Sequence, residues 1–210
     1  MADDVFWFAF DGLADWETPY ALTAITNRAG QKTPGRLRVR TVALRHAVVT
    51  TMGGVHVQPH LTLDEMDPAA CALLILPGGD AWETGGNTEA AGCARAVLKA
   101  GGLVAAICGA TLGLARAGLL DERRHTSNAR EYLAASGYGG GALYEDAPAI
   151  TDRGVITAGA VFPVDFARHV ARALELYPDD VLEAWYRLHK TGRAEYYQAL
   201  VKATEARATA

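Results

Sequence analysis

The chain has 210 residues, of which 50% are hydrophobic and 21% are charged, and its formal net charge is -4 at pH 7. A chain of this length buries about 70% of the surface that its unfolded form would expose, so one hydrophobic core is expected without disulfides. The mild negative charge excludes a strongly basic protein of the kind that binds a phosphate backbone, and no nucleic-acid partner is expected.

The N-terminal segment MADDVFWFAF carries two acids where a secretory signal would carry lysine or arginine, which predicts a cytoplasmic protein. The longest uncharged run, residues 101–115, is shorter than the roughly 20 apolar residues that cross a bilayer, so no membrane partner is expected. Three cysteines are an odd number, which argues against a disulfide framework. Cys71 and Cys93 are interpreted as buried structural thiols.

The first sixty residues predict two strands, a helix and a hairpin. Residues 5–10 are a β-prone apolar run, and the apolar spacing after them is typical of a helix that ends at Gly30. Residues 37–44 alternate polar and apolar side chains like a half-exposed strand. Residues 48–60 predict a hairpin that turns at a Gly-Gly pair.

The middle of the chain alternates buried strands with helices. Residues 71–76 are a continuous apolar run that ends at Pro-Gly-Gly, which is typical of a strand buried on both faces of a parallel sheet. A helix over 88–99, a strand over 103–108 and a helix that ends at Gly118 follow. This alternation predicts a doubly wound α/β sandwich with right-handed crossovers.

The last third of the chain is predicted to be mainly helical. Asn128 and Glu131 have the spacing of a capping box, which predicts a short helix with Asn128 as its cap. Residues 143–159 predict two strands that turn at 152–154. Three helices are expected after them, over 165–177, 180–190 and 194–208. Because no repeat or linker interrupts the chain, a single domain over 1–210 is expected, with 178–210 as a helical extension.

Ligands of open α/β sheets bind at the carboxyl ends of the strands, near the point where the strand order reverses. This rule selects residues 11–17, residues 77–83 and the segment CGAT, which begins at Cys108. Cys108 falls between a buried strand and the first turn of a helix, a turn similar to a nucleophile elbow. Helix N-termini lower the pKa of cysteine, so the position favours a thiolate. A buried structural cysteine is the alternative interpretation.

The other two segments supply candidate partners for Cys108. The amides of Gly79 and Gly109 could form an oxyanion hole, because glycine lets the backbone approach a ligand closely, although most glycine pairs are plain turns. Asp80 is a further candidate neighbour. Glu17 either complements a helix dipole or, buried against Cys108, keeps a raised pKa and acts as general acid and base.

These segments together resemble the ThiJ/PfpI superfamily, which is related to class I glutamine amidotransferases. The resemblance rests on ILPGGD, on AAICGATLGLARAGLLDERRHTSN and on the acid in DGLADWE, and it extends over about residues 4–175. It implies a homodimer with a flavodoxin-like three-layer sandwich, a mostly parallel sheet with helices on both faces. It also implies that Cys108 is the nucleophile, Glu17 its carboxylic partner, and Gly79 with Gly109 the oxyanion donors. The C-terminal helices resemble an addition seen in a bacterial amidotransferase-like branch.

The sequence departs from the superfamily pattern where many members carry a histidine beside the cysteine. Here Gly109 follows Cys108, and Asn128 stands at the later position. His125 is a candidate site neighbour, with a surface or hydrogen-bonded histidine as the alternative interpretation. His169 falls inside a predicted helix. Without a histidine base, glutaminase activity is disfavoured.

Three functions remain open from the sequence. The first is an enzyme of hydrolase or lyase type, in which the Cys108 thiolate adds to a small electrophile such as an α-oxoaldehyde or an isonitrile and Glu17 moves protons. The second is a non-enzymatic stress protein that senses oxidants through oxidation of Cys108. Their expected partner is a small-molecule substrate or oxidant, with no metal and no cofactor. The third is a dimeric interaction module whose contact surface is formed by Trp185, Tyr186, Tyr196 and Tyr197.

Overall fold

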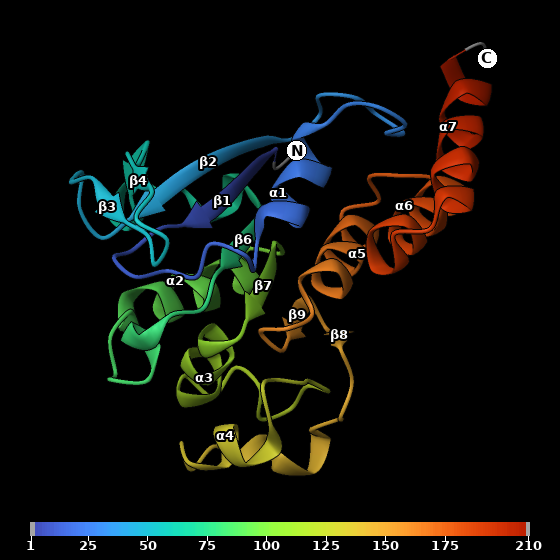
Figure 1. Ribbon diagram of the computed structural model, residues 1–210. Helices are drawn as coiled ribbons and strands as arrows, with labels where there is room; N and C mark the ends of the chain where they lie inside the picture. Colours follow the sequence, from blue (N-terminus) through green and yellow to red (C-terminus); the bar gives the residue numbers. More distant parts are fainter. Residues whose placement is uncertain (1–2, 209–210) are drawn as a thin grey trace.

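The computed structural model describes residues 3–208 and contains a central seven-stranded sheet (Figure 1). Its strands are β1 (Asp4–Phe8), β2 (Arg38–Ala43), β5 (Leu61–Thr62), β6 (Cys71–Leu76), β7 (Leu103–Ile107), β8 (Ala149–Asp152) and β9 (Val155–Ala158). Their order in the sheet is β5-β2-β1-β6-β7-β9-β8. All neighbouring pairs are parallel except β8 with β9, which confirms the mostly parallel sheet.

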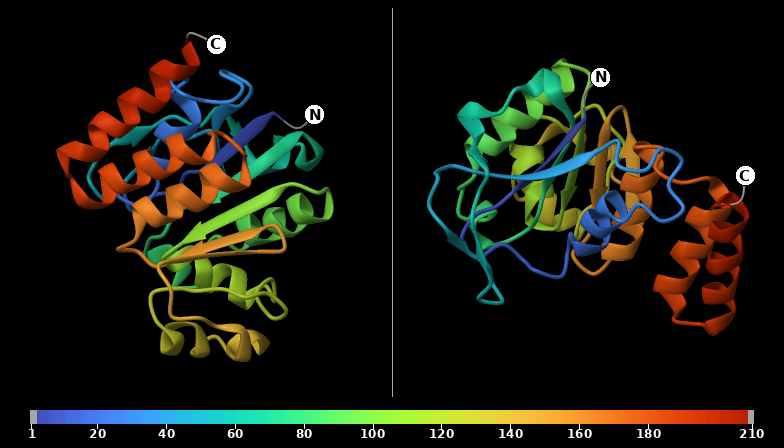
Figure 2. Two further views of the ribbon diagram at one scale, coloured as in Figure 1. Left: turned by 90° about the vertical axis from the view of Figure 1, so that its right-hand side faces the viewer. Right: turned by 90° about the horizontal axis from the view of Figure 1, so that it is seen from above.

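Helices cover both faces of the sheet, which confirms the three-layer sandwich (Figure 2). One layer contains α2 (Thr88–Lys99) and α3 (Gly109–Arg116), and the opposite layer contains α1 (Pro19–Thr26) and α5 (Pro163–Ala173). None of the helices in the described part of the chain is long and apolar enough to span a membrane. The remaining helical segments are α4 (Arg130–Ala134), α6 (Asp179–Thr191), α7 (Ala194–Ala208), η1 (Leu63–Glu65), η2 (Pro68–Ala70), η3 (Asp80–Trp82) and η4 (Gly139–Leu143).

The central strands are buried on both faces, as their uninterrupted apolar sequences predict. In β6, Leu74 and Leu76 pack into the core beneath α2 and α3, whereas Leu73 and Ile75 pack into the core beneath α1 and α5. The alternation follows from the two-residue period of a strand. Because β1, β6 and β7 are parallel, the segments that follow them meet at one edge of the sheet.

The first ninety residues differ from the prediction in several places: α1 ends at Thr26 instead of Gly30, and β5 was not predicted. The chain after β1 continues as a loop over residues 9–18, so α1 begins only at Pro19 and Glu17 precedes the helix. Proline is suited to a first helical turn, where its missing N–H would have no partner. The predicted hairpin is present, but β3 (Val49–Thr50) and β4 (His56–Val57) form a separate two-stranded sheet.

The predicted role of Asn128 as a helix cap is wrong. The residue before α4 is Ala129, and no side chain caps that helix. The side chain of Asn128 is engaged elsewhere, because its Oδ1 accepts the backbone N–H of Ala160 at 2.9 Å. Asn128 therefore fixes the loop after β9 instead of the start of α4.

Two helical glycines near Trp82 differ in the space that a side chain would find. A Cβ on Gly113 of α3 would lie 2.3 Å from ring carbons of Trp82, whereas a Cβ on Gly92 of α2 would meet nothing within 4 Å. We expect Gly92→Ala to raise the free energy of unfolding by about 1 kcal/mol through helix propensity. Gly113→Ala is expected to lower it by roughly 1–3 kcal/mol through overpacking. Urea denaturation measures both, and equal effects would contradict the placement of Trp82.

Candidate active site

Cys108 occupies the turn between β7 and α3 in a strained backbone conformation, with φ +58° and ψ −126°. Positive φ is rare for residues other than glycine and costs about 1–3 kcal/mol. The turn is held by hydrogen bonds: the N–H of Cys108 donates to the carbonyl of Ala158 at 3.0 Å, and its carbonyl accepts the Thr111 hydroxyl at 2.6 Å. This is the geometry of a nucleophile elbow.

Glu17 is a fully buried carboxylate, 0% exposed. Its Oε2 accepts the N–H of Gly78 at 2.6 Å, whereas Oε1 accepts no hydrogen bond from the described residues. Burial raises the pKa of Glu17 to about 7, although the Gly78 amide and the Cys108 thiol act in the opposite direction. Glu17 can therefore hold or release a proton near neutral pH.

Gly78 allows Cys108 and Glu17 to approach each other. A Cβ at this position would lie 2.6 Å from the Cβ of Cys108 and 2.8 Å from each carboxylate oxygen of Glu17. The carbonyl of Gly78 also accepts the N–H of Ala14 at 3.0 Å, which ties the loop after β6 to the loop after β1. The sequence analysis singled out Gly79 and missed Gly78, although the Pro-Gly-Gly pattern was the available signal.

The Cys108 thiol is partly buried, and its surroundings disfavour ionisation. Burial, and then the negative charge of Glu17, raise the pKa of Cys108 to about 11. The Asn128 amide donates to Sγ at 3.4 Å, and together with the amide of Gly109 it acts to lower that pKa. The expectation that the helix N-terminus leaves a thiolate at rest is therefore wrong. Burial and the charge of Glu17 thus disfavour the thiolate form of Cys108, and burial favours the protonated form of Glu17.

Of the remaining predicted neighbours, Gly79 and Gly109 lie close to each other, whereas Asp80 lies at the surface. Gly79 and Gly109 pass close together, since a Cβ on Gly109 would lie 3.0 Å from the carbonyl oxygen of Gly79. Gly79 has φ +150°, and a Cβ there would lie 2.7 Å from the carbonyl oxygen of Gly12, so only glycine fits. Asp80 is exposed at the start of η3, where its backbone carbonyl accepts the N–H of Glu83 at 3.0 Å.

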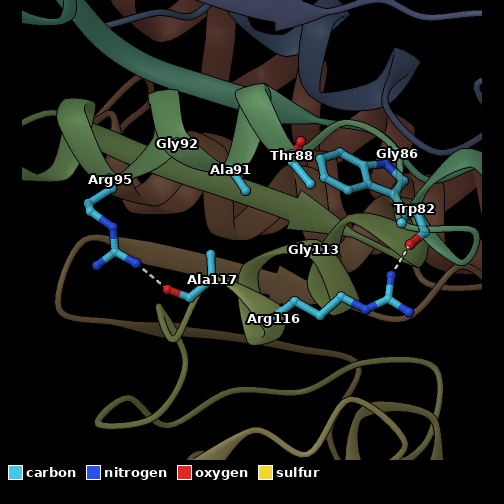
Figure 3. Close-up of a pocket in the computed structure, with 10 residues that line it drawn as sticks. Trp82, Gly86, Thr88, Ala91, Gly92, Arg95, Gly113, Arg116 and Ala117 are labelled. Carbon is cyan, nitrogen blue, oxygen red and sulfur yellow. Dashed lines mark hydrogen bonds between the residues drawn. The ribbon is translucent and has the colours of Figure 1, made fainter.

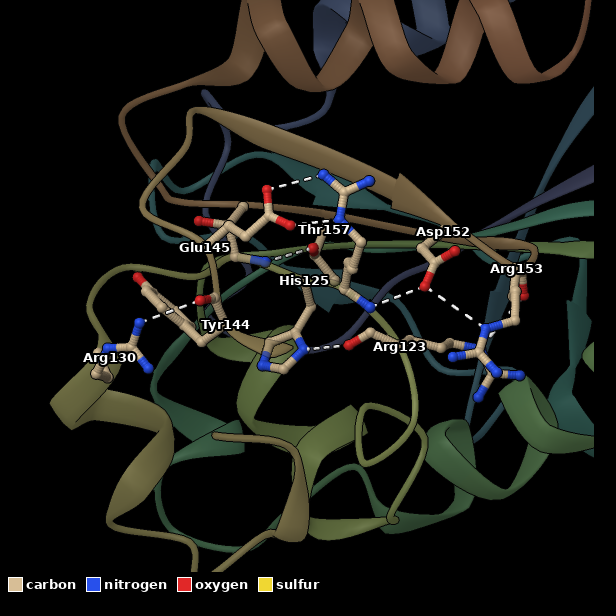
Figure 4. Close-up of polar contacts among 10 residues, drawn as sticks. Arg123, His125, Arg130, Tyr144, Glu145, Asp152, Arg153 and Thr157 are labelled. Carbon is tan, nitrogen blue, oxygen red and sulfur yellow. Dashed lines mark hydrogen bonds and ion pairs between the residues drawn. The ribbon is translucent and has the colours of Figure 1, made fainter. Parts of the chain in front are cut away.

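His125 is fully buried and belongs to a polar network that includes the carbonyl of Arg123 (Figure 4). One ring nitrogen bonds the carbonyl of Arg123 at 2.7 Å, and the other bonds the hydroxyl of Tyr138 at 2.8 Å. Both nitrogens are thus occupied, and burial lowers the pKa of His125. The hydrogen-bonded alternative for this histidine is correct. His169 lies in α5, as predicted, and bonds the hydroxyl of Thr151 at 2.8 Å.

Trp82 is a supporting residue that the sequence analysis missed. Its indole N–H donates to the carbonyl of Pro77 at 2.8 Å, and a Cβ on Gly109 would lie 3.2 Å from its ring. Trp82 therefore packs the loop after β6 against the turn at Cys108 and Gly109. No group of three or more His, Cys, Asp or Glu side chains within residues 3–208 is arranged to hold a metal ion.

The match to known proteins agrees with this architecture. Residues 3–173 match the DJ-1/PfpI family, and the chain belongs to that family. The uncharacterized protease YoaZ of Bacillus subtilis is 36% identical over 200 residues, which are 94% of this chain and 95% of YoaZ. The uncharacterized protease YdeA of the same organism is 26% identical over 189 residues, 87% of this chain and 88% of YdeA.

A solved structure similar to this chain is the thiJ/pfpI family protein of Bacillus anthracis, with a TM-score of 0.90 and 35% identity. The superposition covers 97% of this chain and 98% of that one. A DJ-1 superfamily protein of Agrobacterium tumefaciens has a TM-score of 0.81 and 30% identity, and it covers 91% of this chain and 100% of its own. The flavodoxin-like sandwich implied by the sequence is thereby confirmed.

The raised pKa of Glu17 predicts a pH-dependent stability difference between the wild type and Glu17→Gln. The native state keeps the Glu17 proton up to a pKa of about 7, whereas the unfolded chain releases it near 4.5. The stabilisation is therefore complete below pH 4.5 and is lost as the pH rises to 7, in total about 3 kcal/mol relative to Glu17→Gln. Urea denaturation of both proteins from pH 4 to pH 8 measures it, and a constant difference would contradict the raised pKa.

Proposed function

We propose that the protein is a cysteine-dependent enzyme of hydrolase or lyase type in which Cys108 adds to a small electrophile. The observation that supports this is the pairing of a thiol in a strained turn with a buried carboxyl group, Glu17, whose pKa of about 7 suits proton transfer at neutral pH. The partial burial of Cys108 favours small substrates over folded polypeptides.

The addition requires one proton to move in each direction. As the bond from Sγ to the electrophilic carbon forms, the thiol proton of Cys108 passes to the carboxylate of Glu17. The displaced π-electron pair moves to the oxygen of a carbonyl substrate, where the amides of Gly79 and Gly109 are the proposed donors. Glu17 then returns the proton to that oxygen.

Hydrolysis is the form of this chemistry that the relatives favour. YoaZ and YdeA both carry the name protease. In hydrolysis of an amide, protonated Glu17 would supply the proton that the leaving amine needs, and water would then release the acyl group from Cys108. Short peptides therefore belong in the substrate panel beside α-oxoaldehydes, amides and isonitriles.

The test compares turnover of this panel by the wild type, by Cys108→Ala and by the matched control Cys93→Ala. Cys93 is a second partly buried thiol, on α2, so its substitution controls for the loss of a sulfur atom. We expect turnover of at least one class that Cys108→Ala abolishes and Cys93→Ala retains. Equal turnover by all three proteins, or none by the wild type, would contradict the enzyme proposal.

A redox-sensing role is the second candidate, and one contact favours it. The Asn128 amide and the Gly109 N–H both face Sγ, so they could donate to the oxygens of a sulfinic acid formed there. A reducing cytoplasm, where we propose that the protein works, would keep the thiol reduced until an oxidant arrives. Mass spectrometry after mild peroxide should then find sulfinic acid at Cys108 while Cys71 and Cys93 stay reduced. Equal oxidation of all three would contradict this role.

We also propose that two copies of the chain associate through the hairpin of β3 and β4. Apolar side chains of this region are exposed in the single chain: Val48 is 50%, Met52 49% and Val55 57% exposed. A second apolar surface would shield these side chains from water. In a symmetric dimer, the same surface of the other copy provides it. Sedimentation should show a dimer for the wild type and a monomer for Val55→Asp; a wild-type monomer would contradict the proposal.

A further inference from the structure

Asn128 is an exposed residue whose side chain contacts the sulfur of Cys108. Its Nδ2 donates to Sγ at 3.4 Å, and the residue is open to solvent. Glu17, the carboxyl group that contacts the same thiol, is fully buried. An electrophile that reaches Sγ from solvent therefore passes Asn128 and not Glu17.

The α3 side of the turn at Cys108 is closed to an electrophile. The ring of Trp82 is buried, at 1% exposed, and a Cβ on Gly109 would lie 3.2 Å from it. Arg116 of α3 donates to the carbonyl of Trp82 and holds this segment in place (Figure 3). The approach to Sγ is thus left to the side of Asn128.

The chain next to Asn128 is anchored to both β9 and α3. The N–H of Thr126 donates to the hydroxyl of Thr157 in β9 at 2.9 Å. The hydroxyls of Ser127 and Thr111, the latter in α3, bond each other at 2.6 Å. The side chain of Asn128 therefore projects from a backbone that is fixed before any ligand arrives, and a donor held in this way needs no reorganisation during a reaction.

The orientation of the Asn128 amide is fixed by Ala160. Oδ1 accepts the N–H of Ala160 at 2.9 Å, so Nδ2 must face Sγ. In the reverse orientation, the amide N–H groups would face the N–H of Ala160, and two donors cannot bond each other. The amide nitrogen carries two N–H donors, and among residues 3–208 only the sulfur takes one of them. The second donor is left for an atom bound next to Sγ.

We propose that Asn128 is a catalytic residue that donates to the oxygen of a carbonyl substrate, beside the amides of Gly79 and Gly109. This inference rests on the proposed function and narrows its substrate class. When Sγ bonds to a carbonyl carbon, the π-electron pair moves to the oxygen, where an amide N–H stabilises the charge. Attack on an isonitrile leaves the electron pair on the carbon, which must then take the proton, and no oxyanion forms. The donors of Asn128 therefore favour α-oxoaldehydes and amides over isonitriles.

The test is fluorine NMR of the full chain with trifluoroacetone, a ketone that adds reversibly to thiols and needs no turnover. We expect the wild type to form an adduct that Cys108→Ala lacks. The pKa of the adduct oxygen, measured from the fluorine shift against pH, should rise by about one pH unit or more in Asn128→Ala, because a hydrogen bond to a charged group is lost. Asn27→Ala should leave it unchanged, since Asn27 is an exposed asparagine that also accepts a backbone N–H.

Asn128→Asp separates a donor to the substrate from an anchor for the loop after β9. Its carboxylate keeps an oxygen for the N–H of Ala160 but offers no amide donor, so the adduct pKa should rise at least as far as in Asn128→Ala. A wild-type adduct pKa in either variant, no adduct in the wild type, or Cys108-dependent turnover of isonitriles would overturn the inference. A wild type that forms the adduct and turns over nothing would contradict only the enzyme proposal.

Discussion

Glu17→Gln is expected to lower turnover about 10²- to 10⁴-fold while it accelerates alkylation of Cys108. Turnover falls because the amide cannot accept the thiol proton or return it to the substrate. Alkylation accelerates because the charge of Glu17 is one of the causes that raise the pKa of Cys108, so its removal increases the thiolate population.

The measurement pairs turnover on the best substrate of the panel with the rate of iodoacetamide labelling of Cys108 at pH 8. Glu122→Gln, at an exposed position, is the control for the loss of one carboxylate. Labelling by Glu17→Gln that is slower than labelling of the wild type would contradict the proposed electrostatic effect. Turnover unchanged by Glu17→Gln would remove Glu17 from the mechanism.

Gly78→Ala is expected to abolish turnover and to lower the free energy of unfolding by roughly 1–3 kcal/mol. The new Cβ would lie 2.6 Å from the Cβ of Cys108 and 2.8 Å from both oxygens of Glu17, so the pair must separate. Gly141→Ala is the matched control, because a Cβ on Gly141 would meet nothing within 4 Å. Turnover assays and urea denaturation of both variants measure the effect. Wild-type turnover in Gly78→Ala would contradict the close approach of the pair.

The sheet and the position of Cys108 at the end of β7 were predictable because their signals are local. β6 and β7 are buried on both faces, so every residue of each strand must be apolar, and the run that ends in Cys108 shows this directly. The strand that ends at Cys108 and the helix that starts at Gly109 then define the turn. Parallel order brings the loops after β1 and β6 to the same edge.

The protonation state of the site was not predictable from the sequence. The helix N-terminus at Cys108 is a local feature and suggested a thiolate, whereas the pKa of the thiol is set by burial and by Glu17, ninety-one positions earlier in the chain. Asn128 shows the same limit. Its spacing to Glu131 fits a capping box, but the loop after β9 offers the N–H of Ala160, and the asparagine bonds that loop and the thiol instead.

The central claim is that Glu17 is the group of the pair that titrates near neutral pH. Carbon-13 NMR of the glutamate side-chain carboxyl groups tests it directly in the wild type, with the Glu17 signal assigned by its disappearance in Glu17→Gln. We predict that this signal titrates with a pKa of about 7, because burial penalises the charged form. A Glu17 signal that titrates at the ordinary pKa of 4.5 would contradict the account.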